Sequence, residues 1–383
     1  MPLPPPFQLI SYIAPAAPAR RTQSRGDLPW LRPEIGFTPK WFKPLNIDFG
    51  RRWHESPKYR RESVLRMRDF VQKQFSAYSV GLLTGDEEQP DLLTGVYGAN
   101  FISSLYGVSQ TYHTSGWPQS KPLNLTDTEI DALRPPVLNE HPLFQKLLKQ
   151  IEWIMISEGK LLGYINWQGI LNNAYRLRGE KLFLDLIDSP ERCIHLFDCL
   201  FETMVEACSC ILEIKGDNVP EKSFFTVSNC LINLVSPEIY ENLLMPYDQK
   251  LATYFGCLGI HNCQWCADPY LEAYSQIDNV GYIDMGIESD LKRARSLFPV
   301  SRRALMLKQD FIKNEQNGNV ENTLERVADE FGCCDLVLAD LDSNHPDGSI
   351  DEFIDQIIRF LEMCSKISDE YKKISPGIAS PGI

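Results

Sequence analysis

The sequence predicts an α/β protein that folds as a TIM-like (β/α)8 barrel. From residue 91 onward, short apolar or β-branched runs alternate with helical patterns, which is typical of parallel strands joined by helices. About seven such strands are spread over roughly 300 residues, the usual size of a single barrel. A doubly wound open sheet is the alternative, but no Gly-rich phosphate-binding loop follows the first strands.

The expected elements can be read in chain order. The strands are Leu93–Tyr97, Leu161–Asn166, Ser223–Asn229, Cys257–Asn262, Val280–Met285, Ala304–Lys308 and Asp335–Asp340. Helical patterns cover Pro57–Phe75, Leu143–Ser157, Pro190–Glu213, Pro237–Tyr254, Asp290–Leu297 and Val320–Phe331. Two of these helices follow a Ser-Pro-Glu triplet, which combines an N-cap, a proline at the first helical position and an acid in the first turn.

Composition limits both the organisation and the partners. Residues 1–30 form a Pro/Ala-rich extension that we expect to be loosely attached, residues 31–372 the barrel, and residues 373–383 a flexible tail. The net charge of −13 argues against a nucleic-acid partner. No run approaches the roughly 20 apolar residues of a membrane helix. The odd count of 11 cysteines, with no secretory signal, favours a reducing cytoplasm.

One stretch, from Gly256 to Tyr270, concentrates groups that can bind a metal. An apolar run ends in His261, and Cys263 follows two residues later. In an extended chain the two side chains leave the same face, so an imidazole and a thiol would converge. Zinc prefers these donors. The alternative is that the cysteines pack as small buried apolar side chains.

The expected strands also share a feature, since nearly all of them end in polar residues. A barrel places its active site at the carboxyl ends of its strands. The polar ends are Asn166-Trp167-Gln168, Ser228-Asn229, His261-Asn262-Cys263, Asp284-Met285-Gly286, Lys308-Gln309-Asp310 and Asp340-Leu341-Asp342.

Taken together, several motifs make the chain resemble the uroporphyrinogen decarboxylase superfamily. The resemblance covers about Leu92 to Ser365 and implies a TIM-like barrel. The motifs are Gly163–Gly169, Arg176–Gly179, Leu184–Leu186, Ser236–Tyr240 with Pro246-Tyr247, Gly259–Cys263, and Asp340 followed by Pro346 and Ile350.

That superfamily holds two chemistries, and the sequence favours one of them. Its decarboxylases need a carboxylate near the first strand, but no Asp or Glu occurs between Leu92 and Thr126. Its cobalamin-linked methyltransferases bind zinc through a His-x-Cys pair, which matches His261 and Cys263, and through a late Cys. Here Asp340 stands near the place of that late Cys and is the expected third ligand.

Other third ligands stay open, and so do other functions. Cys266 is the alternative ligand, followed by Cys333 or Cys334. The resemblance implies a zinc-dependent transfer of a methyl group between a corrinoid, carried by a separate protein, and a thiol or small methylated substrate. A tetrapyrrole decarboxylase and a non-catalytic barrel with a structural metal are the alternatives. The expected substrate-binding residues are Asn166, Trp167, Asn229, Asp284 and Glu288.

Overall fold

The computed structural model of the protein shows a mixed α/β fold built on one parallel sheet. It describes residues 9–13, 30–76, 80–82, 89–216, 224–313, 319–342 and 350–374. The eight strands lie in the order β3-β1-β2-β10-β9-β8-β7-β6, and every neighbouring pair is parallel. Their bounds are β1 Leu9–Ile13, β2 Leu31–Phe37, β3 Val80–Leu82, β6 Phe225–Ser228, β7 Leu258–His261, β8 Val280–Gly286, β9 Arg302–Leu307 and β10 Cys334–Leu341.

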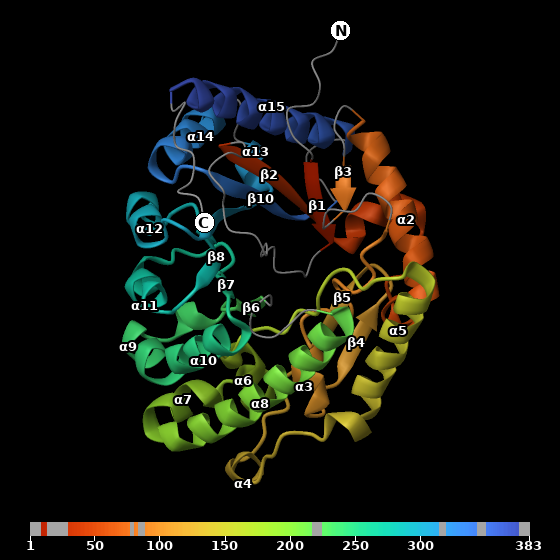
Figure 1. The fold of residues 1–383 in the computed structure, drawn as a ribbon, viewed down its shortest axis with the longest axis vertical. Coiled ribbons are helices and arrows are strands. Elements are labelled where there is room, and N and C mark those ends of the chain that lie inside the picture. The colour runs from red at the N-terminus through yellow and green to blue at the C-terminus, as the bar shows by residue number, and fades with distance from the viewer. Residues whose placement is uncertain are drawn as a thin grey trace.

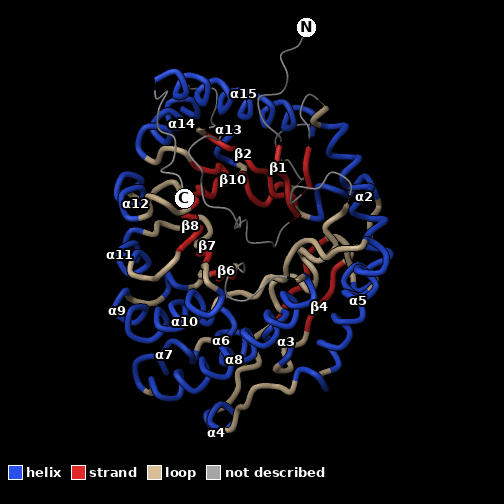
Figure 2. The backbone as a smooth tube through the Cα atoms, in the orientation of Figure 1, coloured by secondary structure: helices blue, strands red, loops and turns tan. Residues whose placement is uncertain are grey.

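Helices surround this sheet on the outside, as Figures 1 and 2 show. Three long helices, α2, α5 and α8, begin within one residue of the predicted start, because each has a proline in its first turn and an apolar stripe that packs inward. The helices are α1 Arg51–Glu55, α2 Pro57–Gln74, α3 Phe101–Leu105, α4 Asp127–Asp131, α5 Pro142–Glu158, α6 Ile170–Arg178, α7 Lys181–Asp188, α8 Pro190–Lys215, α9 Pro237–Ile239, α10 Met245–Phe255, α11 Leu271–Ser275, α12 Leu291–Leu297, α13 Asp310–Lys313, α14 Asn319–Glu330 and α15 Ile350–Ile374.

Smaller elements complete the described chain. An antiparallel hairpin, β4 Gln110–His113 with β5 Gly116–Ser120, lies beside α3 and α5 (Figure 1). The helix predicted over Pro237–Tyr254 is divided by a wide turn at Tyr240–Leu244, where Pro246 cannot donate to the preceding turn. None of the described helices is both long enough and apolar enough to cross a membrane.

Five of the seven predicted strands are confirmed, as β6 to β10, and two are wrong. Leu93–Tyr97 forms a succession of turns with positive φ at Gly95 and Tyr97. The segment Leu161–Asn166 runs without strand pairing, and Gly163 has a φ of 82°. Glycines at positive φ interrupt the hydrogen-bond ladder that a central strand needs. The apolar residues beside them are buried, but they lie in irregular backbone instead of a strand.

The amino-terminal part of the sheet departs from the prediction as well. Residues 9–13 belong to the extension expected to be loosely attached, yet they form β1 and pair with β2 and β3. The β2 strand was missed because Arg32 and Glu34 interrupt its apolar pattern, although all seven of its residues are buried. Most of the predicted tail, residues 375–383, lies outside the described residues.

Two clusters of side chains lie along the sheet, one of ion pairs and one of apolar residues. At one end of the strands, Asp335 of β10 pairs with Arg32 of β2 and Arg302 of β9, all buried. Further along, a small apolar cluster is formed by Tyr282, Ala304, Met306, Val337 and Ala339. Met306 and Ala339 also line a cavity of about 710 Å³, so this cluster forms part of the floor of that cavity.

Candidate metal centre

The register of two neighbouring strands brings two cysteines together. Strands β6 and β7 are parallel, and Ser228 pairs with His261. Cys230 follows Ser228 by two residues, and Cys263 follows His261 by two, so both thiols leave the sheet at the same level. The two Sγ atoms lie 2.9 Å apart, and Cys263 Sγ lies 3.1 Å from His261 Nε2. The ligand atoms of Cys230, His261 and Cys263 all lie within 4.8 Å of one another.

The backbone conformation that brings Cys263 next to His261 differs from the expected extended one. It lies beyond the end of β7, and its φ of 59° is in the left-handed region. The turn at Cys263, and not the alternation of an extended strand, directs its thiol toward the imidazole. Such a conformation is uncommon for a residue with a Cβ and tends to occur at functional sites.

A buried carboxylate from the next strand fixes the imidazole. Asp284 Oδ2 lies 2.6 Å from His261 Nδ1, and Asp284 Oδ1 accepts from the backbone N–H of Asn262 at 2.7 Å. The Tyr282 hydroxyl donates to Asp284 Oδ2 at 3.0 Å. Asp284 is 0% exposed and His261 8% exposed. A proton held on Nδ1 by this carboxylate leaves Nε2 facing the two thiols, as in many metal-binding histidines.

The electrostatics of the cluster favour a thiolate beside a protonated imidazole. The pKa of Cys230 is held well below its usual value by its hydrogen bond with Cys263 and by the neighbouring His261. Burial by itself would lower the pKa of His261, but the charges of Asp284 and Cys263 outweigh burial and raise that pKa well above its usual value. Groups arranged in this way can exchange their protons for a bound cation.

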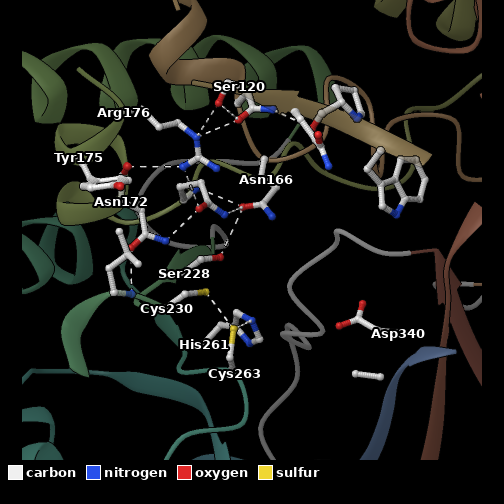
Figure 3. A pocket seen from close by; sticks show the side chains of 18 of the residues that line it. Ser120, Asn166, Asn172, Tyr175, Arg176, Ser228, Cys230, His261, Cys263 and Asp340 are labelled. Carbon is white, nitrogen blue, oxygen red and sulfur yellow. Dashed lines mark hydrogen bonds between the residues drawn. The ribbon is translucent and has the colours of Figure 1, made fainter. Parts of the chain in front are cut away.

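The cluster faces a cavity of about 710 Å³ at the carboxyl ends of the strands (Figure 3). On the cluster side the wall is formed by the ends of β6 and β7. Polar side chains of the α6 region, among them Asn166, Gln168, Asn172 and Arg176, form another wall. Asp340 lies on the far side of the pocket from Asn172 in Figure 3. The site therefore combines three possible metal ligands with open space and a polar lining.

The residue that the structure places beside His261 and Cys263 is not the one expected as the third ligand. The structure places Cys230 with His261 and Cys263, whereas Asp340 lines the same cavity without joining that group. The alternative Cys266 is exposed and lies outside the group. Cys333 and Cys334 lie at the start of β10, the opposite end of that strand from Asp340, and Cys333 Sγ accepts from Arg32 there at 2.7 Å.

Of the expected substrate-binding residues, one lines the cavity and the others lie elsewhere in the structure. Asn166 lines the cavity. Asp284 lies behind His261, and Asn229 donates to the buried Asp248 at 3.0 Å. Trp167 is 5% exposed and stacks on Phe225 at 6.5 Å between ring centroids, in the core. Glu288 is exposed and does not line the described cavity.

Comparison with known proteins shows a likeness in fold. No protein-family model matches the sequence, and no curated protein does either. Among solved structures, the chain is similar to a methyltransferase from Methanosarcina mazei, with a TM-score of 0.59 and 11% sequence identity. The superposition covers 91% of this chain and 94% of that one. Over nearly its whole length, the chain therefore has the fold of that methyltransferase.

Proposed function

We propose that the protein is a zinc-dependent methyltransferase of the uroporphyrinogen decarboxylase superfamily. It would move a methyl group between a corrinoid on a separate protein and a thiol or small methylated substrate. The observation that carries the proposal is the Cys230, His261 and Cys263 group at the edge of an open cavity. The parallel sheet would belong to a TIM-like (β/α)8 barrel, whose strands end at one active-site face.

The three side chains fit zinc by their chemistry. Two sulfurs and one imidazole nitrogen bind zinc in preference to harder cations. Asp284 supplies the carboxylate that commonly supports a ligating histidine. Structural zinc sites are closed by four protein ligands, whereas catalytic sites keep one position for substrate. Three donors that face a cavity match the second kind.

Each part of the site has a role in the proposed reaction. Zinc in this place supplies a Lewis acid that lowers the pKa of a substrate thiol or polarises a methyl donor. Cys230, His261 and Cys263 hold it, and Asp284 keeps the imidazole in one orientation. Asn166 and Ser228, joined at 3.4 Å, present polar groups to the substrate next to the cysteines. Met306 and Ala339 give the floor an apolar surface, which limits water at the reacting end.

Two further parts of the proposal rest on the sequence. The corrinoid would arrive on a partner because this chain has no Asp-x-His-x-x-Gly cobalamin motif. A reducing cytoplasm suits the protein because all 11 of its cysteines are free thiols.

The experiment that tests the function measures metal and methyl transfer on the same protein. Elemental analysis of protein purified without chelator should give about one zinc per chain. X-ray absorption at the zinc edge should show an additional sulfur when 3-mercaptopropionate is added. With methylcobalamin as donor, the absorbance of the methylated corrinoid should fall as the thiol becomes a thioether. Protein without zinc, or zinc whose ligands never change with thiol, would contradict the proposal.

A further inference from the structure

We propose that Cys333, which directly precedes β10, is a modification site that forms a mixed disulfide with a small disulfide carrying carboxylate groups, such as glutathione disulfide. It lies at the opposite end of β10 from Asp340, which lines the cavity with the cysteine and histidine group. The inference therefore does not rest on the proposed function.

Cys333 lies in a short turn between α14 and β10, next to the start of β2. The backbone N–H of Cys334 donates to the Trp30 carbonyl at 3.0 Å, which ties the turn to the residue before β2. Gly332 has a φ of 72°, and a Cβ there would lie 3.0 Å from Arg295 Cζ, so α12 packs against the turn. Cys333 is half-buried, whereas Cys334 is fully buried. Of these two adjacent cysteines, only Cys333 is open to solvent.

A buried arginine contacts the thiol directly. Arg32 Nη1 donates to Cys333 Sγ at 2.7 Å, and Arg32 Nε donates to Asp335 Oδ1 at 2.6 Å. Arg32 is 8% exposed, and its Nη2 is buried without a hydrogen-bond partner among the described residues. A buried N–H group without an acceptor is destabilising. Arg32 therefore has a donor left for a group attached at Cys333.

Two further arginines lie against the backbone of the same turn. Arg303 Nη2 donates to the Phe331 carbonyl at 3.1 Å and to the Cys333 carbonyl at 3.4 Å, and Arg303 Nε is another buried donor without a partner in the described part of the chain. Arg295 Nη1 donates to the Asp329 carbonyl at 3.1 Å. These hydrogen bonds go to backbone oxygens, so they leave the charges of both guanidinium groups uncompensated by the atoms they bind.

The charges around Cys333 favour an anionic reagent. Arg32 and Arg302 share the buried carboxylate of Asp335. Burial by itself would lower the pKa of Arg32, but the charges of Asp335 and Cys333 outweigh burial and raise that pKa. Arginine keeps its charge at any physiological pH, so this end of the sheet attracts negatively charged molecules toward the thiol.

The chemical step is a thiol–disulfide exchange. The Cys333 sulfur, as a thiolate, attacks one sulfur of the small disulfide. A new S–S bond forms to Cys333, the old S–S bond breaks, and the leaving thiolate takes up the proton that Cys333 released. Cys333 is oxidised and the leaving sulfur is reduced, so no other reactant is needed. A carboxylate on the attached half can pair with a guanidinium group, whose planar donors match its two oxygens.

The first arm of the test compares two cysteines of the full-length protein. Mass spectrometry of peptides, after timed exposure to glutathione disulfide, measures the rate at each one. Cys333 should react about tenfold or more faster than Cys266, because arginines surround the first and attract the reagent. Cys266 is more exposed, but partial burial and a hydrogen bond to the Asp268 carboxylate raise the pKa of its thiol. A rate at Cys333 no greater than that at Cys266 would overturn the proposal.

Cys333→Ser assigns the modified atom. It should remove the label from the peptide that contains both adjacent cysteines, since burial raises the pKa of Cys334 to about 12 and excludes the reagent from it. A label that remains on Cys334 in this variant, at the wild-type rate, would contradict the assignment. The result is read at this peptide alone, so it does not depend on whether Cys230 and Cys263 hold zinc.

The second arm separates attraction by charge from simple access. Arg295→Gln should slow the reaction of Cys333 with glutathione disulfide by about threefold or more and leave its reaction with the uncharged 2-hydroxyethyl disulfide unchanged. The matched control is Arg293→Gln, on the same helix, whose arginine is paired with Glu272. It should react like the wild type with both reagents.

Arg32→Gln should slow the reaction with glutathione disulfide further, because it removes the group that contacts the thiol. Circular dichroism shows whether each variant is folded, and Arg295→Gln decides the matter if Arg32→Gln is not. Wild-type rates with glutathione disulfide in folded Arg295→Gln would overturn the proposal, as would an equal loss of rate with the charged and the uncharged reagent.

Discussion

At residue 230 a thiol lies 2.9 Å from the thiol of Cys263, and His261 completes a group of three possible ligands. Cys230 is half-buried in the turn after β6 and lines the cavity. Its low pKa distinguishes it from Cys193 and Cys334, whose pKa values burial raises to about 12. Its place on the cavity wall makes Cys230 a candidate ligand, whereas Cys193 and Cys334 are core side chains.

Removing the Cys230 thiol should therefore weaken zinc binding. We expect Cys230→Ser to reduce affinity by about 100-fold or more, because one of three soft ligands is lost. Competition with a coloured chelator measures this. Asp340→Asn is the matched control, since Asp340 lines the cavity but does not join the ligand group. The opposite pattern, in which Asp340→Asn loses zinc and Cys230→Ser keeps it, would show that the carboxylate is the third ligand.

Asp284 should affect zinc without touching it. Asp284→Asn keeps the size of the side chain but removes the charge that holds His261 Nδ1, so affinity should fall by about 10- to 100-fold. The same competition assay gives the value. Asp278→Asn, at an exposed carboxylate, serves as the control. An unchanged affinity in Asp284→Asn would mean that the imidazole needs no support from this carboxylate.

At the scale of elements, β8 supports the loop that carries Cys263. The Gly286 N–H donates to the Trp265 carbonyl at 2.9 Å, and a Cβ on Gly286 would lie 2.2 Å from the Gln264 carbonyl oxygen. That neighbour is backbone, so it can yield only by moving the loop. Close approach of two backbones is a common reason for a glycine inside a strand.

Gly286→Ala should therefore displace the loop after β7. We expect a folded protein that is destabilised by about 1–3 kcal/mol and binds zinc more weakly, because overpacking shifts the backbone next to Cys263. A urea titration and the zinc competition assay together test this. Gly116→Ala is the control, since its Cβ would meet only His113 Cβ at an ordinary 3.7 Å. Full zinc affinity in Gly286→Ala would show that the loop tolerates the extra methyl group.

The buried ion cluster at the other end of the sheet should make stability depend on pH. Burial alone would raise the pKa of Asp335, but Arg32 and Arg302 outweigh burial and lower it from 3.8 to about 2. A carboxyl whose folded pKa is depressed contributes stability that is present above its unfolded pKa. This contribution, on the order of 2 kcal/mol, should be lost as the pH falls from about 4 to about 2.

Urea midpoints measured across that pH range test the cluster. Asp335→Asn should destabilise the protein at neutral pH by about 3–5 kcal/mol, because two arginines stay buried without their counter-ion. It should also flatten the pH dependence. Glu321→Gln, which removes an exposed partner of Lys366, should change stability by about 0.5 kcal/mol or less. An Asp335→Asn variant as stable as the control would contradict the role of the cluster.

Strand prediction succeeded or failed for identifiable reasons. The strands β6 to β10 have apolar or β-branched cores that the pattern reveals. The β2 strand was not predicted because its buried Arg32 is paired with Asp335 of β10, which also pairs with Arg302 of β9, and a sequence does not show such pairing between strands. Leu93–Tyr97 is apolar enough for a strand, yet positive φ at Gly95 and Tyr97 places it in turns. Pairing between distant strands explains the first error, and local backbone conformation explains the second.

At the scale of the whole molecule, the fold is shared with a protein of very different sequence. The structure shares its fold with a methyltransferase at only 11% identity. An apolar pattern and suitable side-chain volumes are enough to preserve a fold while most residues change. The cavity lies at the carboxyl ends of the parallel strands, a common place for ligand sites in α/β folds.

The candidate site was partly accessible from the sequence. His261 and Cys263 could be predicted as a pair because they are close in the chain and of the right residue types. Asn166 was found because it follows a buried apolar run. Cys230 had a readable signal, since it follows the polar end of the preceding strand at the same offset as Cys263 follows His261. Arg176 stands in one of the motifs that carry the resemblance, but it was not predicted as a site residue, because an arginine near a helix end is ordinarily solvated.

The sequence by itself determined the alternation of strands and helices and one pair of possible metal ligands, since both are local properties of spacing and residue type. Only the tertiary structure decided that β1 and β2 extend the sheet, that Cys230 lies beside the pair and that Arg176 faces the same cavity. These are contacts between distant parts of the chain. They depend on strand register and on which charges can be paired when water is excluded. No single segment of the sequence determines either of these.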